Sequence, residues 1–433
     1  MQKQIPPKKK LYFGWWIVVV GFLIMGLNYA PSHTMLGLFL KPLAEEFAVT
    51  RTASAVIAII GSVSGMVTSL FAGRLLARYS LKKMAVIALG LQTLNYVGYA
   101  LAGSIAVIAV TGFIGGILNM FVTTLPISVL INNWFGSKIR GRAWGITMVG
   151  SGVGSMVLSP VVGVIIENWG WRFGYGFFGL LSVALIPLVL LTFVRHPQDK
   201  GLAIIGEPTA TTQAHKKPAI TGIPAKNALR SGMFWVLTIA VVLLGGSIHS
   251  WSVNGSAYLS DQGFDTIQVS FLLSISSVGL IIGKVLLGTI CDKKGTKYGV
   301  LFSGGIFALG LFMSFFLGSL PWLAYPLVVL LGIGLATSTV TVPLMTRDLF
   351  GIREYSVIAG FTESGLKLGG ALVPLGVSLV YDFSGSYKPA WVTIIAFCVA
   401  AITLVFTAYK MRPKAMEKYE AAEHTIGVPA PSV

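Results

Sequence analysis

Long apolar runs separated by short polar intervals recur along nearly the whole chain. Each run is long enough for a helix to cross a bilayer core, which takes about 20 residues. The twelve runs cover residues 14–39, 53–77, 83–103, 105–131, 143–167, 173–194, 234–259, 268–290, 298–317, 322–345, 356–380 and 389–409. The pattern predicts an all-α membrane protein with twelve transmembrane helices.

The composition supports a protein embedded in the lipid bilayer. Of the 433 residues, 55% are hydrophobic and 11% are charged, and the mean hydropathy is +0.80, which excludes an ordinary soluble domain. Cys291 and Cys398 lie too far apart in sequence to indicate a disulfide or metal framework. The chain shows no phosphate loop, zinc spacing or nucleophile triad. We therefore expect neither an enzyme nor a protein with a cofactor or metal.

The net charge of +17 follows the topology of the chain. If the amino terminus is cytoplasmic, 26 of the 32 lysines and arginines fall in the tails and in the loops on the same side. This asymmetry obeys the positive-inside rule. It predicts a multi-pass protein of the cell membrane, inner or plasma, with both termini in the cytoplasm. The basic excess therefore indicates no nucleic-acid partner.

The two halves of the chain carry matching segments. "GRLLARYSLKK" (73–83) and "GTICDKKGTKY" (288–298) are offset by 215 residues, as are "WFGSKIRGRAWG" (134–145) and "LFGIREYSVIAG" (349–360). A constant offset indicates a tandem duplication of six-span units. We expect two pseudo-symmetric six-helix bundles, 1–194 and 233–433, joined by a cytoplasmic linker, 195–232. Parallel repeats of this kind favour bundles that rock about a site near the membrane midplane.

Short motifs add a family resemblance. "GTICDKKGTK" resembles the loop motif of the major facilitator superfamily, with Gly288 and Asp292 in the motif positions. "YFGWWIVVVGFL", "NNWFGSKIRGRAWG", "NWGWRFGYGF", "YLSDQGF" and "SGSYKPAW" resemble its monocarboxylate porter and oxalate/formate antiporter branch. The resemblance implies the major facilitator fold, transport as a monomer, and a conformational latch at Asp292. In the first copy of the motif Ala77 replaces the acidic residue, so a latch there is weaker.

Four titratable residues lie well inside the predicted spans: His249, Lys284, Glu363 and Lys367. A charge at the centre of a membrane helix costs about 2.5–3.5 kcal/mol on insertion scales, so each instance needs a partner, a cavity or a function. Two lysines against one carboxylate favour a site for an anion. Glu363 and Lys367 are spaced i, i+4, so mutual neutralisation is the competing explanation for Glu363.

Lys284 has no carboxylate three or four positions away, which favours anion binding over a snorkelling lysine. The resemblance supports this, because similar carriers bear a basic residue, usually arginine, eight positions before the acidic residue of the loop motif. Lys367 lies near a lysine of the oxalate/formate branch. Leu280 stands where many proton-linked relatives have an acid, so no proton relay is expected at that position.

The remaining polar candidates are less specific. His249 can bind an anion, carry a coupled proton, or pack as a hydrogen-bonded residue. His33 is interpreted as an interfacial or entrance residue near the outer end of the first span. Three residues can hydrogen-bond a carboxylate or hydroxyl, although hydrogen bonding between helices explains each at least as well: Asn28, Tyr29 and Asn119. Asn254 and Tyr258 lie near His249 and are further candidates for binding substrate.

The pattern as a whole predicts a secondary active transporter of a small organic anion. The substrate would be a monocarboxylate such as lactate or pyruvate, or a related mono- or dicarboxylate, carried by alternating access. Proton symport through Glu363 or His249 is the leading form of coupling, and exchange of one anion for another is the alternative. Two other hypotheses stay open: proton-driven export of an amphipathic compound with Glu363 as the acceptor, and a membrane sensor that does not transport.

Overall fold

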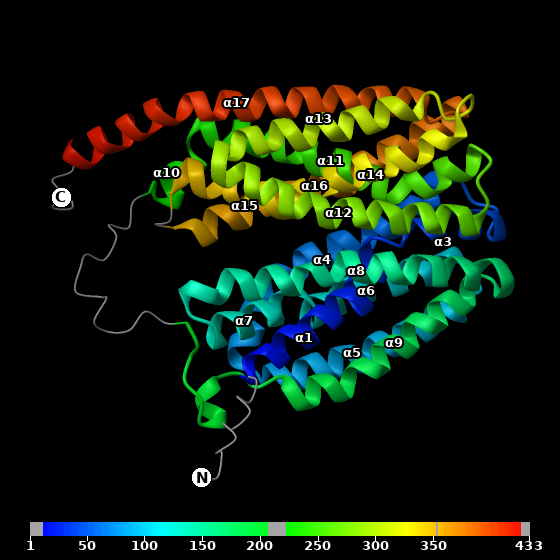
Figure 1. Ribbon diagram of the computed structural model, residues 1–433, viewed down its shortest axis with the longest axis horizontal. Helices are drawn as coiled ribbons and strands as arrows, with labels where there is room; N and C mark the ends of the chain where they lie inside the picture. Colours follow the sequence, from blue (N-terminus) through cyan, green and yellow to red (C-terminus); the bar gives the residue numbers. More distant parts are fainter. Residues whose placement is uncertain (1–11, 207–221, 352–353, 426–433) are drawn as a thin grey trace, which may run out of the picture.

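The computed structural model describes residues 12–206, 222–351 and 354–425, and over these ranges the chain is helical with no β-strand (Figure 1). Twelve spans follow one another in order. The first six are Gly14–Glu46 (α1–α3), Arg51–Arg78 (α4), Leu81–Ala100 (α5), Ile105–Trp134 (α6 and α7), Ser137–Trp169 (α8) and Trp171–Thr192 (α9). The last six are Gly232–Asp261 (α11), Thr266–Lys294 (α12), Thr296–Ser314 (α13), Pro321–Phe350 (η4, α14 and α15), Tyr355–Ser384 (α16) and Lys388–Thr425 (α17).

Most helices are longer than the apolar runs that predicted them. Ten described segments are long and apolar enough to cross a membrane, and α4 and α5 complete the twelve. Helix α5 is less hydrophobic because it carries a polar face. Its side chains Gln92 and Asn95 are buried against the neighbouring helices, 2% and 6% exposed. The polar face therefore points into the protein and leaves apolar positions for lipid.

Three spans are built from shorter helices. The first contains α1 (Gly14–Ile24), a π-helical turn η1 (Met25–Tyr29), α2 (Ala30–His33) and α3 (Gly37–Glu46). The fourth and tenth break between α6 (Ile105–Val122) and α7 (Thr124–Trp134), and between α14 (Ala324–Leu335) and α15 (Thr337–Phe350). Backbone irregularity at membrane depth is tolerated where it is buried in protein or lines a cavity. The breaks therefore indicate where a site can lie.

The duplication is visible in the packing. Gly154 lies against Gly26, so that an added side chain would meet the backbone of the first span. Its counterpart Gly369, 215 residues later, lies in the same way against the backbone of Val242 in α11. The glycines of spans five and eleven thus bring each of these helices close to the first helix of its own bundle.

The two bundles meet along the antiparallel pair α8 and α12. Ser274 donates a hydrogen bond to the carbonyl of Met156 at 2.5 Å, and nearer the end away from the termini Gly163 lies against Ser270. At that same end the backbone amide of Thr52 donates to Asp382 at 3.1 Å. In Figure 1 the bundles lie close together toward α3 and separate toward the side that holds both termini. The molecule is therefore closed at the end opposite the termini.

The two ends of the predicted linker are docked onto equivalent loops. The amide of Gly136 donates to the carbonyl of Ile205 at 2.9 Å, and the amide of Ile223 donates to the carbonyl of Phe350 at 2.9 Å. Phe350 stands 215 residues after Phe135, the neighbour of Gly136. The two ends of the linker, 195–206 and 222–231, are therefore ordered against the bundles, and residues 207–221 lie outside the described range.

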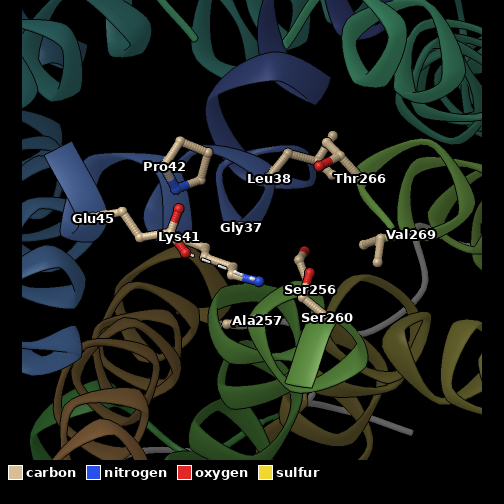
Figure 2. A pocket seen from close by; sticks show the side chains of 10 residues that line it. All are labelled: Gly37, Leu38, Lys41, Pro42, Glu45, Ser256, Ala257, Ser260, Thr266 and Val269. Carbon is tan, nitrogen blue, oxygen red and sulfur yellow. Dashed lines mark ion pairs between the residues drawn. The ribbon is translucent and has the colours of Figure 1, made fainter. Parts of the chain in front are cut away.

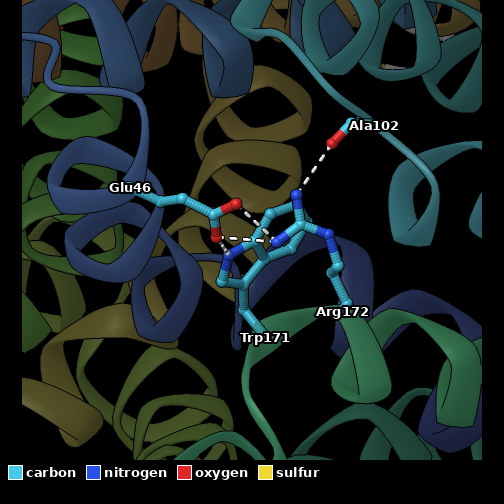
Figure 3. Close-up of polar contacts among 4 residues, drawn as sticks. All are labelled: Glu46, Ala102, Trp171 and Arg172. Atoms are coloured by element: carbon cyan, nitrogen blue, oxygen red, sulfur yellow. Dashed lines mark hydrogen bonds and ion pairs between the residues drawn. The ribbon is translucent and has the colours of Figure 1, made fainter.

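A polar cluster fixes the end of the first span to α9 (Figure 3). The Glu46 carboxylate accepts hydrogen bonds from Trp171 at 2.5 Å and from Arg172 at 2.7 Å. Arg172 also donates to the carbonyl of Ala102 at 3.0 Å and lies 4.3 Å over the Trp171 ring. The segment "NWGWRF" therefore acts in the packing of the first bundle.

Candidate functional site

Five polar side chains lie within electrostatic range of one another where the broken first span faces α11 and α16. Tyr29 ends η1 and His33 ends α2, and their ring centroids are 4.2 Å apart. His33 interacts electrostatically with His249 of α11 and Lys367 of α16. Tyr29 interacts electrostatically with Glu363, also on α16. We call these five residues the central cluster, and both bundles contribute to it.

The side chains of the central cluster are accessible. His33 is exposed, and Tyr29, His249, Glu363 and Lys367 are half-buried. They come from helices of both bundles. A few convergent polar groups are usual in ligand sites, which makes the central cluster the candidate site.

The His249 ring is held in one orientation. Its Nδ1 lies 2.8 Å from the carbonyl oxygen of Gly245, and the ring rests against Gly370, where an added Cβ would approach within 2.9 Å. A carbonyl oxygen only accepts hydrogen bonds, so Nδ1 carries the hydrogen. Nε2 is left to bind a ligand or a proton.

Lys367 and Glu363 lie on the same helix but do not form a contact pair. The structure describes both side chains and shows no ion pair between them, although they interact electrostatically over a longer distance. The neutralisation that the i, i+4 spacing suggested is therefore not made by direct contact. The Lys367 ammonium is available to a carboxylate from outside the chain.

Lys284 connects the two bundles. Its Nζ, on α12, donates to the carbonyl oxygen of Met148 at 3.2 Å and to Ser151 Oγ at 3.4 Å, both on α8. Beside it, an added Cβ at Gly152 would lie 2.8 Å from Ile281. Among the described side chains Lys284 has partners on α8 only. It is therefore a charged contact across the bundle interface and lies apart from the central cluster.

Two of the residues predicted to bind substrate, Asn254 and Tyr258 of α11, make hydrogen bonds within the second bundle. Asn254 donates to the carbonyl of Pro374 at 3.2 Å and accepts from Ser378 at 2.8 Å. Tyr258 donates to the carbonyl of Ser314 at 2.5 Å. These hydrogen bonds attach α11 to α16 and to the end of α13. Both side chains thus take part in helix packing, and their role in substrate binding stays a prediction.

Two further residues predicted to bind substrate, Asn28 and Asn119, make hydrogen bonds within the first bundle. Asn28 donates to Ser182 of α9 at 3.4 Å. Asn119 accepts from Thr123, one turn later on the chain, at 2.9 Å, next to the break in the fourth span. Both side chains are buried, 0% and 4% exposed. They support the irregular backbone of their spans, and a direct contact with substrate stays a prediction.

The predicted latch lies at the end of α12. Gly288 has open space around it, since an added Cβ would meet no atom within 4 Å. The side chain of Asp292 lies outside the described part of the structure. The latch that the motif implies therefore stays a prediction.

Sequence reasoning missed His33. It was interpreted as an entrance residue because the apolar run seemed to end at residue 39. The span continues to Glu46, which moves His33 from the outer end to the middle. The charged pattern of α3, with Lys41 and Glu45 one turn apart, was the available signal that the helix extends further.

Comparison with known proteins places this arrangement in a family. The model of the Major Facilitator Superfamily matches residues 12–374 and 250–431. The chain belongs to this superfamily. The sialic acid transporter NanX of Escherichia coli K12 is 22% identical over 414 residues, covering 93% of this chain and 95% of the relative. Monocarboxylate transporter 11 of Mus musculus is 22% identical over 400 residues, covering 90% and 86%.

Solved structures show the same fold. The nucleoside transporter NupG aligns with a TM-score of 0.68 at 14% identity and covers 92% of this chain and 100% of its own. The chain is accordingly a multi-pass membrane transporter of this superfamily, with two bundles of six helices. An identity of 14% indicates a shared fold and gives no information about the substrate.

Proposed function

We propose that the protein is a secondary transporter of a small organic anion that bears a carboxylate group. The observation that carries the proposal is the solvent-accessible central cluster, in which Lys367 lies without a contact ion pair beside His33 and His249. A carboxylate is the complementary ligand for the Lys367 ammonium, and His33 and His249 add polar groups beside it. The names of the relatives agree, since sialic acids and monocarboxylates both carry this group.

Alternating access follows from the way the bundles share these contacts. The cationic groups Lys284 and Lys367 and the imidazole of His249 belong to the second bundle, whereas His33 and the α8 acceptors of Lys284 belong to the first. A carboxylate that binds between the bundles changes the interactions across the interface. Such a difference in binding between conformations is what allows a ligand to shift their equilibrium.

For the coupling we propose proton symport, with Glu363 or His249 as the proton carrier. Glu363 lies one turn from Lys367 and interacts electrostatically with it, so its protonation changes the net charge of the site. Exchange of one anion for another is the alternative. In exchange the substrate itself, and no proton, would balance the cations on the return step.

Uptake by purified protein in liposomes tests the proposal. Labelled lactate, pyruvate, formate and oxalate are offered with an inward proton gradient and, separately, with trapped unlabelled anion. Stimulation by the gradient indicates symport, and stimulation only by trapped anion indicates exchange. Lys367→Gln should abolish uptake, whereas Lys388→Gln, which removes an exposed lysine at the start of α17, should not. Equal uptake by Lys367→Gln and the parent would refute the central cluster as the site.

Topology and assembly are part of the same proposal. The positive-inside pattern places both termini in the cytoplasm, the bundles divide at 195–232, and the carrier acts as a monomer. Single cysteines at Gly141 and at Leu101, both exposed and at opposite ends of the molecule, should react with an impermeant maleimide from opposite sides. Labelling of Leu101→Cys from the cytoplasmic side would overturn the orientation.

A further inference from the structure

A second pocket lies between the bundles at the end opposite the termini (Figure 2). It is formed by α3 of the first bundle and by α11 and α12 of the second, and its volume is about 110 Å³. Lys41 of α3 reaches into it, and Figure 2 shows the ammonium pointing toward Ser256 and Ser260. Thr266 closes another side, and Glu45 lines the rim beside Lys41. The pocket is thus lined by one ion pair and three hydroxyl groups.

The hydroxyl groups of the pocket make no hydrogen bond to a residue that the structure describes. Most serines of α11 donate to the carbonyl one turn back, as Ser250 does to Gly246 at 2.7 Å. Within the described part of the chain, Ser256, Ser260 and Thr266 make no such bond. Ser256 is only 5% exposed, and a buried hydroxyl without a partner is costly. Ser260 and Thr266 are half-buried beside it, so all three can donate to a ligand.

The charge of Lys41 is only weakly compensated. Its partner Glu45 lies 4.0 Å away, and that side chain is 67% exposed. Ion pairs of this kind contribute about 0–1 kcal/mol. The neighbouring carboxylate of Glu46 is already bound to Trp171 and Arg172. An anion entering the pocket therefore competes with a weak, solvated contact only.

Volume and chemistry together define the ligand. A cavity of about 150 Å³ accommodates benzene, so a pocket of about 110 Å³ fits a carboxylate of two or three carbon atoms. The ammonium would bind the carboxylate, and the hydroxyls would donate to its oxygens or pair with a substrate hydroxyl. We propose that this pocket is a second binding site for a small carboxylate, distinct from the central cluster.

Helix α11 connects the pocket with the central cluster. Ser252, Ser256 and Ser260 continue along α11 at helical spacing from His249, and Gly37 of α3 packs onto this row. An added Cβ at Gly37 would lie 2.7 Å from Ser256 Oγ. The close contact at Gly37 thus separates the pocket from the central site. If the protein transports carboxylates, an anion bound in this pocket could move on to the central cluster. This role rests on the proposed function, whereas binding of a carboxylate in the pocket does not.

Equilibrium binding of labelled lactate to the purified full-length protein tests the proposal. The measurement is made first in the Lys367→Gln chain, where the central cluster has lost its lysine. We expect one bound lactate per chain to remain. Adding Lys41→Gln should lower the affinity at least tenfold, and adding Ser256→Ala should lower it about threefold or more, because each removes a donor. Adding Lys388→Gln, which removes an exposed lysine at the same end, should leave it unchanged.

Two results overturn the pocket as a carboxylate site. One is the absence of lactate binding in the Lys367→Gln chain, checked in Lys367→Met in case the first variant does not fold. The other is unchanged affinity after Lys41→Gln and Ser256→Ala. The proposed function fails independently of both: a parent protein that binds lactate through Lys41 but takes up no carboxylate into liposomes keeps this site and loses the transport role.

Discussion

A close contact with the α11 backbone lies at Gly37 of the closed end, and it gives a sharp test of the conformational argument. An added Cβ there would lie 2.7 Å from Ser256 Oγ, 3.0 Å from the Ser252 carbonyl oxygen and 3.2 Å from the Val253 carbonyl oxygen. Two of these atoms belong to the α11 backbone, which no change of rotamer can move. Gly37→Ala therefore has to separate α3 from α11.

The size of the effect follows from the overlap. Forcing an extra methyl group into a packed contact costs about 1–3 kcal/mol. The cost falls only on the conformation in which α3 touches α11. It therefore shifts the equilibrium between the closed and open forms of this end by about 5–150-fold, and Gly37→Leu should shift it further.

Distances between spin labels measure this shift. Leu101 in the first bundle and Phe383 in the second are 78% and 89% exposed and lie at the closed end, so cysteines there can be labelled without disturbing packing. Gly37→Ala should add or enlarge a population with a longer distance. Gly176→Ala, at a glycine with no atom within 4 Å of an added Cβ, is the control. If both variants kept the distance distribution of the parent, α3 and α11 would not form the closure.

Three further predictions concern the charged groups. Lys284→Met should lower the rate of lactate uptake into liposomes at least tenfold, because it removes the charge-assisted contacts with Met148 and Ser151 across the bundle interface, which contribute about 1.5–3 kcal/mol. Lys284→Arg should retain part of the rate, and equal rates in all three proteins would contradict this role. Glu46→Gln should lower the Tm in detergent. The loss of stability should be about 1 kcal/mol, because the Glu46 side chain is 38% exposed and solvent weakens its ion pair. Glu45→Gln, at the exposed neighbouring position, should leave the Tm unchanged. Glu363→Gln should remove stimulation by a proton gradient and preserve anion counterflow, and stimulation that persists would exclude Glu363 as the carrier.

The fold could be predicted from the sequence because the bilayer demands long apolar helices. The apolar runs predict the twelve spans. The constant offset of 215 residues predicts the duplication, and the equivalent contacts of Gly154 and Gly369 confirm it. The helix ends were placed too far inward, since helices continue into polar residues outside the bilayer core. The breaks before Thr124 and Thr337 were not foreseen, because they depend on contacts between distant segments.

The candidate site could be predicted only in part. Lys284, Glu363, Lys367 and His249 stand out because a titratable group in an apolar span is expensive. Asn28 has the same pattern in sequence as a ligand would, yet it donates to Ser182 of a neighbouring helix. The direction of a polar side chain depends on the rotation of each helix in its bundle, and a single sequence contains no such information.

The unequal contribution of the two bundles limits how the carrier can work. The second bundle holds both lysines, Glu363 and His249, and the first contributes His33, Tyr29 and the α8 acceptors of Lys284. A bound carboxylate would stay with the second bundle, where the fixed charges are, and exchange its weaker partners as the first bundle moves. The α8 acceptors hold Lys284 only while the bundles are in contact there. An anion that attracts this ammonium would therefore weaken the contact between α12 and α8. A ligand that changes the contacts of one conformation in this way provides the differential interaction that alternating access requires.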